Sequence, residues 1–291
     1  MDTTLLAQLA ANGIAVGMGY ALAAVGLALV FGILEQVNFA HGEIYMLGAF
    51  VLFTFAKPLG VPYWGACALT LAVMAVAGVL LAEIAFIPTL KRPFESVILA
   101  TFALSVVLQN GARLVFGASP RELEAPLEAL SFEVGGILLF GQRLLIAAIG
   151  LLAFVALAAF LRRTESGRAM RAVAQNKDAA VMVGIDIARI TRITGAIGAA
   201  ITGLAACVIA PMFDLSPNMG TDVVFKSFAV VIIGGMGNIA GTLIAGLMLG
   251  LAESFAGGLV NTAVRDGIGF SLMILMLLLR PQGLFGKTVR V

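Results

Sequence analysis

The chain carries very little charge. Only 12% of its 291 residues are Asp, Glu, Lys or Arg, whereas 61% are hydrophobic. Soluble domains average about 25% charged residues, and a soluble protein of this length has too much surface relative to its volume to hide so much apolar area. The composition therefore excludes an ordinary soluble domain and indicates a protein that sits in lipid.

Histidine and cysteine are nearly absent. His41 is the only histidine, and the two cysteines, Cys67 and Cys207, lie inside apolar runs. This pattern favours packing over a disulfide and contains no Cys/His spacing of a metal site. The sequence also lacks an aromatic and basic patch or a long basic arm. We therefore expect no metal and no cofactor on this chain, and no nucleic-acid partner.

The apolar runs are continuous, as in "LLIAAIGLLAFVALAAFL" (144–161). Strands of an outer-membrane barrel would alternate apolar and polar residues, and the 34 glycines suit helices that approach closely in lipid. "MDTTLLAQLA" lacks the basic start of a cleavable signal, so we expect the first apolar run to stay as a span. These features predict an all-α, polytopic helical membrane protein with one transmembrane domain over residues 1–291.

Eight or nine membrane elements follow from the requirement of about 20 apolar residues for each span. The segments 40–56 and 221–237 are short, so we expect interrupted or re-entrant helices there. The predicted segments are 10–33, 40–56, 63–87, 94–116, 137–161, 191–210, 221–237, 238–257 and 264–279.

The distribution of Lys and Arg predicts the orientation, because cytoplasmic loops are enriched in these residues. Twelve of the 18 basic residues fall on one side of this arrangement, which we assign to the cytoplasm, with the N-terminus outside and the C-terminus inside. The twelve are Lys91, Arg92, Arg162, Arg163, Arg168, Arg171, Lys177, Arg189, Arg192, Arg280, Lys287 and Arg290.

Two stretches resemble each other: "NFAHGEIYMLGAF" from Asn38 and "NIAGTLIAGLMLG" from Asn238. Paired interrupted helices in the two halves of a chain indicate the central pathway of a transporter, so we expect a possible inverted repeat with both interruptions inside the membrane. An ordinary loop at the membrane surface is the alternative for the second stretch. The predicted pathway or helix-interruption residues are Asn38, His41, Gly42, Glu43, Gly234, Gly235, Gly237 and Asn238.

Further polar residues lie inside the predicted spans, where ionisable groups are usually functional. Gln109, Asn110, Glu253 and Asn261 are additional pathway candidates. Their alternative role is structural, because buried amides and carboxylates often satisfy interrupted backbone. No Ser or Cys nucleophile can be paired with His41, so we expect hydrogen bonding from this histidine and no catalytic residue.

The only long polar segment assigned to the cytoplasm is 162–190. It reads as two short helices separated by "QNKD" (175–178), with Ser166 as a candidate N-cap and Ala169, Ala172 and Val173 on one apolar face. A small apolar face with a basic rim indicates a docking element for a cytosolic protein; a solvated charged run is the alternative. The predicted coupling residues are Gly167, Arg168, Arg171, Ala172, Gln175, Asn176 and Gly184.

Four stretches together resemble a known family. They are "GMGYALAAVGLALVFGILEQVNFAHGEIYMLGAF" (17–50), "TESGRAMRAVAQNKDAAVMVGI" (164–185), "VVIIGGMGNIAGTLIAGLMLGLAES" (230–254) and "RPQGLFG" (280–286). They resemble the permeases of branched-chain amino acid ABC importers, and the shorter of the two permease subunits most closely.

The resemblance implies a bacterial or archaeal plasma-membrane subunit and several partners. These would be a second homologous permease, in a heterodimer, two cytosolic ATP-binding subunits and an extracytoplasmic substrate-binding protein. ATP and Mg²⁺ would be bound by the partners, and residues 164–185 would couple this chain to the ATPase.

The expected activity is alternating-access import of branched-chain or other hydrophobic amino acids. The competing hypothesis is a secondary transporter or channel for a small polar solute such as urea or amides. A further alternative, an intramembrane enzyme, lacks paired acids, a metal cluster or a nucleophile.

Overall fold

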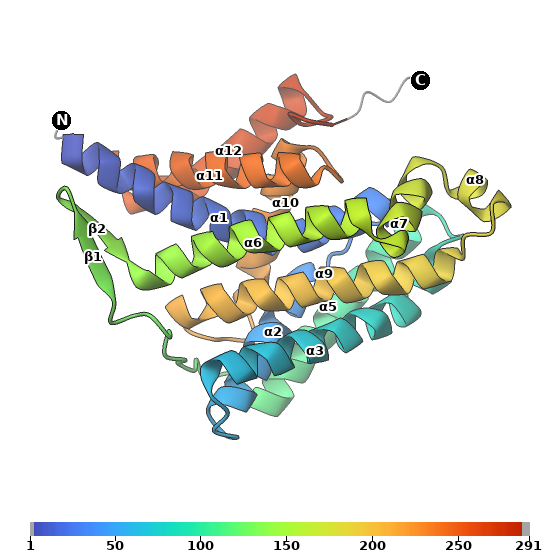
Figure 1. Cartoon of the computed structure of the whole chain (residues 1–291), viewed down its shortest axis with the longest axis horizontal. Coiled ribbons are helices and arrows are strands. Elements are labelled where there is room, and N and C mark those ends of the chain that lie inside the picture. Colours follow the sequence, from blue (N-terminus) through green and yellow to red (C-terminus); the bar gives the residue numbers. More distant parts are fainter. Residues whose placement is uncertain (1–2, 287–291) are drawn as a thin grey trace.

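The computed structural model describes residues 3–286, apart from the side chains of residues 262–264 and 266. It confirms an all-α polytopic membrane protein (Figure 1). Among the described residues, six helical segments have the length and apolar composition to cross a membrane. They are α1 (Thr3–Leu34), α3 with its continuation (Tyr63–Thr89), α5 (Phe94–Phe116), α6 (Gly141–Arg163), α9 with its continuation (Ile187–Met212) and α11 (Ile239–Leu259).

The remaining elements are shorter. α3 itself is Tyr63–Leu81 and continues through a π-helical turn (Ala82–Phe86) into α4 (Ile87–Thr89), whereas α9 is Ile187–Ile209 and ends in a 3₁₀ turn (Ala210–Met212). The other helices are α2 (His41–Ala56), α7 (Glu165–Gln175), α8 (Lys177–Met182), α10 (Met219–Gly234) and α12 (Thr262–Leu279). Each of the nine predicted segments overlaps one helix.

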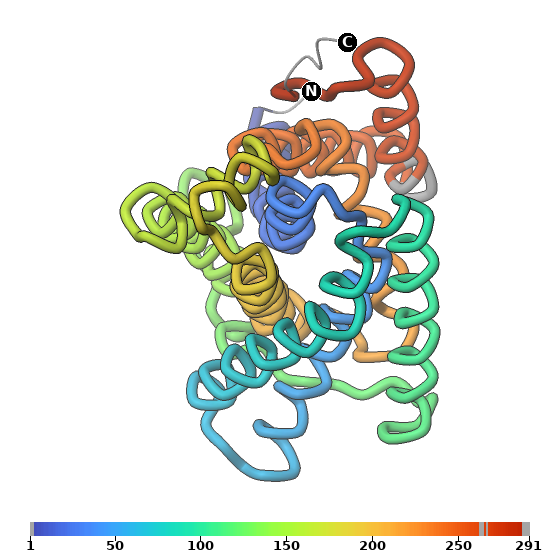
Figure 2. The backbone as a smooth tube through the Cα atoms, turned by 90° about the vertical axis from the view of Figure 1, so that its right-hand side faces the viewer, coloured from blue at the N-terminus to red at the C-terminus, as the bar shows by residue number. Residues whose placement is uncertain are grey.

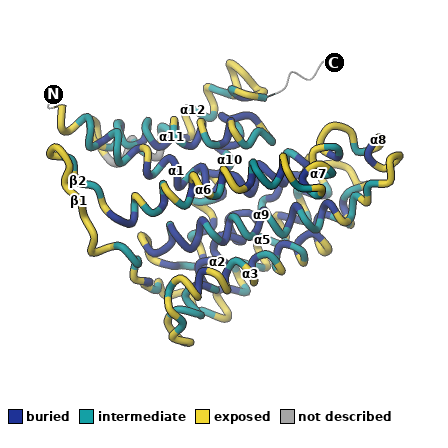
Figure 3. Tube along the Cα trace, in the orientation of Figure 1, coloured by how far each residue is buried: buried dark blue, intermediate teal, exposed yellow. Residues whose placement is uncertain are grey.

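The helices run between two ends of the molecule, which Figure 1 shows on opposite sides. One end carries the N-terminal turn of α1 and a β-hairpin, and we call it the hairpin end. The other carries α7 and α8, and we call it the α7–α8 end. Figure 3 shows that the hairpin and α8 are largely exposed, whereas the middle of α1 is buried. Two basic residues used for orientation, Lys287 and Arg290, lie outside the described residues.

The β-hairpin corrects the predicted helix 137–161. Residues Ile137–Phe140 form β2, which pairs antiparallel with β1 (Ser131–Val134), and α6 begins only at Gly141. Gly135 and Gly136 have φ angles of 59° and 80°, which is the geometry that a two-residue hairpin turn requires. "ILLF" continues into the apolar helix without a break, and periodicity cannot separate a strand from a helix in so short an apolar run.

α1 is the central helix, packed against α11, α9, α10 and α6. The contact with α11 is very close: a Cβ on Gly17 would lie 2.7 Å from the carbonyl oxygen of Gly246. Gly13 and Gly17 on α1 face Gly246 and Gly250 on α11, with four-residue spacing on both helices. Small residues at this spacing allow helix backbones to pack directly in lipid. Glycines therefore allow the close contact between α1 and α11 at the centre of the fold, as the sequence predicted.

Candidate functional site

The segment that follows α1 turns back into the helix bundle. Glu35 takes a positive φ of 56°, and α2 begins at His41, whose Nε2 lies 2.7 Å from the carbonyl oxygen of Ala23. Ala23 lies eleven residues before Leu34, which is about 16 Å along a helix. Six extended residues cover that distance at about 3.3 Å each. α2 therefore starts about halfway along α1 and runs back toward the hairpin end.

A second segment enters from the hairpin end. Leu215 is fully buried, and its N–H donates to the carbonyl oxygen of Arg121 over 2.8 Å. α10 then begins at Met219 beside the start of α2, where Gly220 and Gly42 meet backbone to backbone. α2 and α10 have 16 residues each and run from this point toward opposite ends of the molecule. We call this meeting of two half-length helices the junction.

Gly42→Ala should destabilise the junction, because a Cβ at this position would overlap the carbonyl oxygen of Gly220. We expect the free energy of unfolding to fall by roughly 1–3 kcal/mol, the usual cost of overpacking a tight core. Thermal unfolding of the purified protein in detergent measures this. Gly111→Ala on α5 is the matched control, because a Cβ there meets nothing within 4 Å. Equal unfolding temperatures for the two variants would contradict the tight contact.

The structure corrects the expected interruption at Gly234, Gly235, Gly237 and Asn238. These residues form the turn between α10 and α11, and a Cβ on Gly237 would lie 2.6 Å from the Cα of Gly32, close to the last residue of α1. The turn therefore lies at the α7–α8 end, whereas the first interruption lies beside the middle of α1. Asn238 caps α11, since its Oδ1 accepts from Gly241 N over 2.9 Å.

The partner of the first interruption was missed in the sequence. It is "SPNMGTD" (216–222), where Asn218 and Gly220 open α10 much as Asn38 and Gly42 open α2. The signal available was Pro217 followed by Asn and Gly at the start of a short apolar run. The short helix expected at 221–237 agrees with α10, and what the sequence did not reveal is that its start pairs with the start of α2.

The segment 280–286 closes the turn between α10 and α11. The N–H groups of Leu284 and Phe285 donate to the carbonyl oxygens of Ile233 and Gly234 over 2.8 and 3.2 Å, and Asn238 Nδ2 donates to Phe285 O over 2.9 Å. The last carbonyls of a helix have no partner within it, so this segment supplies donors to the end of α10. The "RPQGLFG" stretch thus has a structural role at the α7–α8 end.

The polar residues around the start of α2 differ in how well they are satisfied. Asn38 is buried, and its Oδ1 accepts from Ala40 N over 3.1 Å. His41 is buried against the Ala23 carbonyl and has the expected hydrogen-bonding role. Glu43 is only 3% exposed, yet its Oε2 has no hydrogen-bond partner among the described residues. Glu43 is therefore the least satisfied of the predicted pathway residues.

The predicted coupling segment forms α7 and α8, but its face is oriented differently from the expectation. Thr164, not Ser166, is the N-cap, since its Oγ1 accepts from Gly167 N over 3.0 Å. Gly167, Met170 and Val173 are buried against the rest of the chain. A Cβ on Gly167 would lie 2.6 Å from Leu161 Cα, so α7 folds back tightly onto α6.

The apolar face of α7 thus packs mainly against its own protein. Of the residues expected on the docking face, Val173 is buried, and Ala169 and Ala172 are half-buried. Arg168 and Arg171, expected to form the basic rim, are exposed.

α8 carries the exposed apolar surface instead. Val181, Met182 and Val183 are 56%, 88% and 76% exposed, and we call these three residues the α8 tip. Asn176 caps α8, with its Oδ1 accepting from Ala179 N over 2.9 Å, and Gly184 ends the segment with a φ of 85°.

Lys177 ties α8 to the start of the junction segment. Its Nζ donates to the carbonyl oxygen of Leu34 over 2.6 Å and lies 3.4 Å from the Glu35 carboxylate. Lys177 therefore contacts both the last residue of α1, Leu34, and the first residue of the segment that leads to α2, Glu35.

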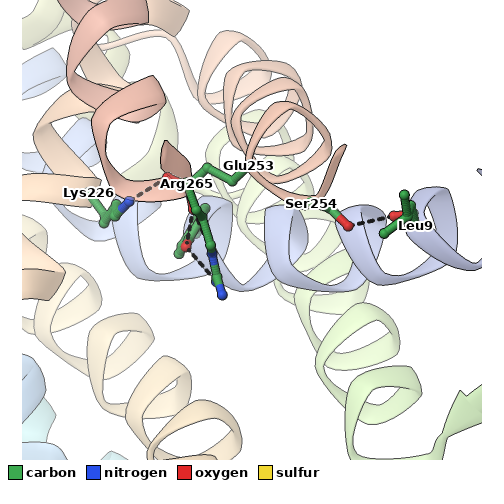
Figure 4. A network of polar contacts seen from close by, with 6 residues as sticks. Leu9, Lys226, Glu253, Ser254 and Arg265 are labelled. Atoms are coloured by element: carbon green, nitrogen blue, oxygen red, sulfur yellow. Dashed lines mark hydrogen bonds and ion pairs between the residues drawn. The ribbon is translucent and has the colours of Figure 1, made fainter. Parts of the chain in front are cut away.

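Glu253 lies in a charged cluster with Lys226 and Arg265 (Figure 4). Its side chain is fully buried and forms an ion pair with Lys226 of α10; Arg265 of α12 lies 3.5 Å away. The hydroxyl of Tyr20 on α1 donates to Glu253 Oε2 over 2.7 Å. The cluster joins four helices, so Glu253 has an evident structural role.

The chain is similar to known transport proteins over most of its length. Residues 9–277 match the family described as "Branched-chain amino acid transport system / permease component". The chain is 31% identical to the permease protein BraD of Pseudomonas aeruginosa, named for high-affinity branched-chain amino acid transport, over 95% of this chain and 94% of that protein. It is 31% identical, with the same coverage, to the correspondingly named LivH of Escherichia coli K12.

A more distant similarity points to the second kind of permease. The chain is 25% identical to LivM of Salmonella typhimurium, also named as a permease of this transport system, over 93% of this chain and 68% of that protein. The long match to the family and the LivH-type relatives agree with the fold of spanning and half-length helices. The chain therefore belongs to the branched-chain amino acid permease family of ABC transport systems, whose members are multi-pass membrane transport components and not enzymes.

Proposed function

We propose that the chain is the membrane-spanning subunit of an ATP-driven importer for branched-chain or other hydrophobic amino acids. Family membership supports this activity over a secondary transporter or channel. Two half-length helices that meet inside the bundle suit alternating access, in which parts of a repeat rock around a central site.

The observation that carries the proposal is the link made by Lys177. The α8 tip is exposed and apolar, as a docking surface requires. The first residue of the same helix, Lys177, holds Leu34 O and Glu35 at the start of the segment leading to the junction. A push on α8 by an ATPase subunit would therefore act directly on the backbone that positions α2.

The predicted coupling residues divide between two roles in this proposal. Arg168, Arg171 and Gln175 are exposed and available to a partner. The others belong to the element itself: Gly167 allows the close contact with α6, Asn176 caps α8 and Gly184 ends it, while Ala172 is half-buried.

The partners in this proposal follow from the family. They are a second permease, for which the LivM-type relatives are the natural candidates, two cytosolic ATP-binding subunits and an extracytoplasmic binding protein. ATP and Mg²⁺ would bind to the partner subunits.

The α7–α8 end carries the basic residues Arg162, Arg163, Lys91 and Arg92. Because cytoplasmic loops are enriched in basic residues, this end would face the cytoplasm of a bacterial or archaeal cell. The N-terminus would then lie outside.

Charge reversal on α7 tests the coupling. Arg168→Glu with Arg171→Glu should lower ATP-dependent uptake and substrate-stimulated ATP hydrolysis in proteoliposomes that contain the whole importer, while membrane insertion stays unchanged. The reason is that buried or partly buried charge pairs across an interface contribute about 2–5 kcal/mol when one partner is removed.

The matched control is Lys91→Glu with Arg92→Glu, which reverses two exposed charges at the same end of the molecule. We expect near-normal uptake from this control. Normal uptake by the Arg168/Arg171 variant would contradict the coupling role, and uptake that needs no ATP would contradict the proposed function itself.

A further inference from the structure

α5 carries a line of polar side chains through an apolar span. Thr101, Ser105, Gln109 and Arg113 are spaced four residues apart. Successive residues at this spacing are neighbours on the helix surface, and the series of four rises about 18 Å while it turns by about 120° around the helix. α5 stands at the edge of the bundle (Figure 2) and is among the least buried of the spanning helices. Its lipid-exposed side is apolar, with Leu99, Phe102 and Val107 all exposed.

Three of the four residues, Thr101, Ser105 and Arg113, contact residues at or next to the junction. At one end, Thr101 Oγ1 accepts from Phe39 N over 3.3 Å, in the segment that leads into α2. At the other end, Arg113 Nη2 donates to Asn218 Oδ1 over 2.6 Å, immediately before α10. Ser105 lies between them and faces the carboxylate of Glu43. The line therefore passes both half-helices where they begin.

Glu43 stands out because the fold does not supply it with a counter-ion. It is 3% exposed, its Oε2 has no hydrogen-bond partner, and none of the ion pairs among the described residues involves it. Glu253, the other buried glutamate, has Lys226, Arg265 and Tyr20 around it. A buried carboxylate without a counter-ion is costly, and in a membrane span such a group usually belongs to a substrate or ion path.

We propose that Glu43 is a recognition group for the ammonium group of the transported amino acid, and that the polar line of α5 forms the wall along which the substrate passes the junction. The proposal rests on the proposed import function. An ammonium group provides up to three hydrogen-bond donors and the charge opposite to a carboxylate. Glu43 directly follows Gly42, so its carboxylate lies beside the point where the backbones of α2 and α10 meet.

Cysteine labelling tests the location without depending on transport. In the assembled importer, Ser105→Cys should react with water-soluble methanethiosulfonate reagents, and the ammonium reagent should react at least about tenfold faster than the sulfonate reagent, because a negative group concentrates cations locally. Adding Glu43→Gln should remove this ratio. Phe102→Cys, on the lipid-exposed side of α5, is the matched control and should stay unreactive. The native Cys67 and Cys207 are buried, which keeps the background low.

The labelling overturns the proposal in either of two ways: Ser105→Cys stays as unreactive as Phe102→Cys, or the preference for the ammonium reagent survives Glu43→Gln. Both results would leave the import function itself standing.

Uptake in proteoliposomes is the second measurement. Glu43→Gln should lower amino acid uptake at least about tenfold, the scale of losing one charge-assisted contact, while ATP hydrolysis still responds to the loaded binding protein. Glu43→Asp should recover part of the uptake. Glu95→Gln, which changes an exposed glutamate in the first turn of α5, is the control and should transport normally.

Unchanged uptake by Glu43→Gln in an importer that is otherwise active contradicts the recognition role. Absence of uptake in the unmodified importer would contradict the proposed function instead.

Discussion

Glu253→Ala is expected to lower the free energy of unfolding by about 3–5 kcal/mol, the usual cost of removing one partner from a buried ion pair. The carboxylate is fully buried and contacts Lys226, Arg265 and Tyr20 from three other helices. Its removal leaves two cationic side chains without this carboxylate in a medium of low dielectric. The midpoint of thermal unfolding in detergent should fall by roughly 10 °C.

Two control variants compare the buried ion pairs of Glu253 with a single hydrogen bond and with an exposed ion pair. Tyr20→Phe removes one hydrogen bond to Glu253 and should cost only about 1 kcal/mol. Glu83→Ala removes an exposed pair with Arg192 and should cost about 1 kcal/mol or less. An unfolding midpoint of Glu253→Ala equal to that of Glu83→Ala would show that the cluster is hydrated and contributes little to the fold.

Met182→Asp is expected to have the largest effect on transport. Met182 is the most exposed residue of the α8 tip, at 88%, and it has apolar Val181 and Val183 on either side. Loss of a central apolar anchor in an interface costs about 2 kcal/mol or more, and a buried carboxylate adds a desolvation cost. We expect ATP-dependent uptake to fall to a few per cent and the ATPase subunits to dissociate during purification. The measurements are uptake in proteoliposomes and the subunit ratio after affinity purification.

The control for this variant is Met236→Asp. Met236 is half-exposed on the turn between α10 and α11, also at the α7–α8 end, but it is not part of the α8 tip. It should retain the ATPase subunits and most of the uptake. If both variants lose the ATPase equally, the docking surface is wider than the α8 tip; if neither does, the α8 tip is not the docking surface.

The sequence predicted the positions of the spanning helices well because long apolar runs have few alternatives in lipid. It also predicted that the chain is interrupted before α2, since Glu35, Gln36, Asn38 and His41 are too polar for the middle of an ordinary span. These side chains are strong signals because each must find a partner inside the protein. Gln36 donates to the Phe86 carbonyl, for example, and His41 meets that of Ala23.

The sequence did not predict which segment packs against that interruption. The glycines at 234–237 gave a strong signal, but glycine serves equally for a tight turn at the surface and for a break inside the membrane. Gly220, by contrast, is significant only because Gly42 lies against it in space. The N-cap at Thr164 and the inward face of α7 were missed for a related reason: an amphipathic pattern gives the apolar side of a helix but does not say whether its own protein or a partner covers that side.

The contact between Gly42 and Gly220 has a consequence for the barrier that this protein presents to ions. Where two complete helices cross, several layers of side chains separate the two aqueous phases. At the junction each half-helix contributes only its first turn, and the two backbones touch through positions that carry a hydrogen atom in place of a side chain. We expect a small displacement of one half-helix against the other to open this contact, because no bulky side chain of either glycine has to move. In the importer proposed above, we therefore expect this contact to exclude hydrated ions as well as substrate, because two main chains in contact leave no room for them.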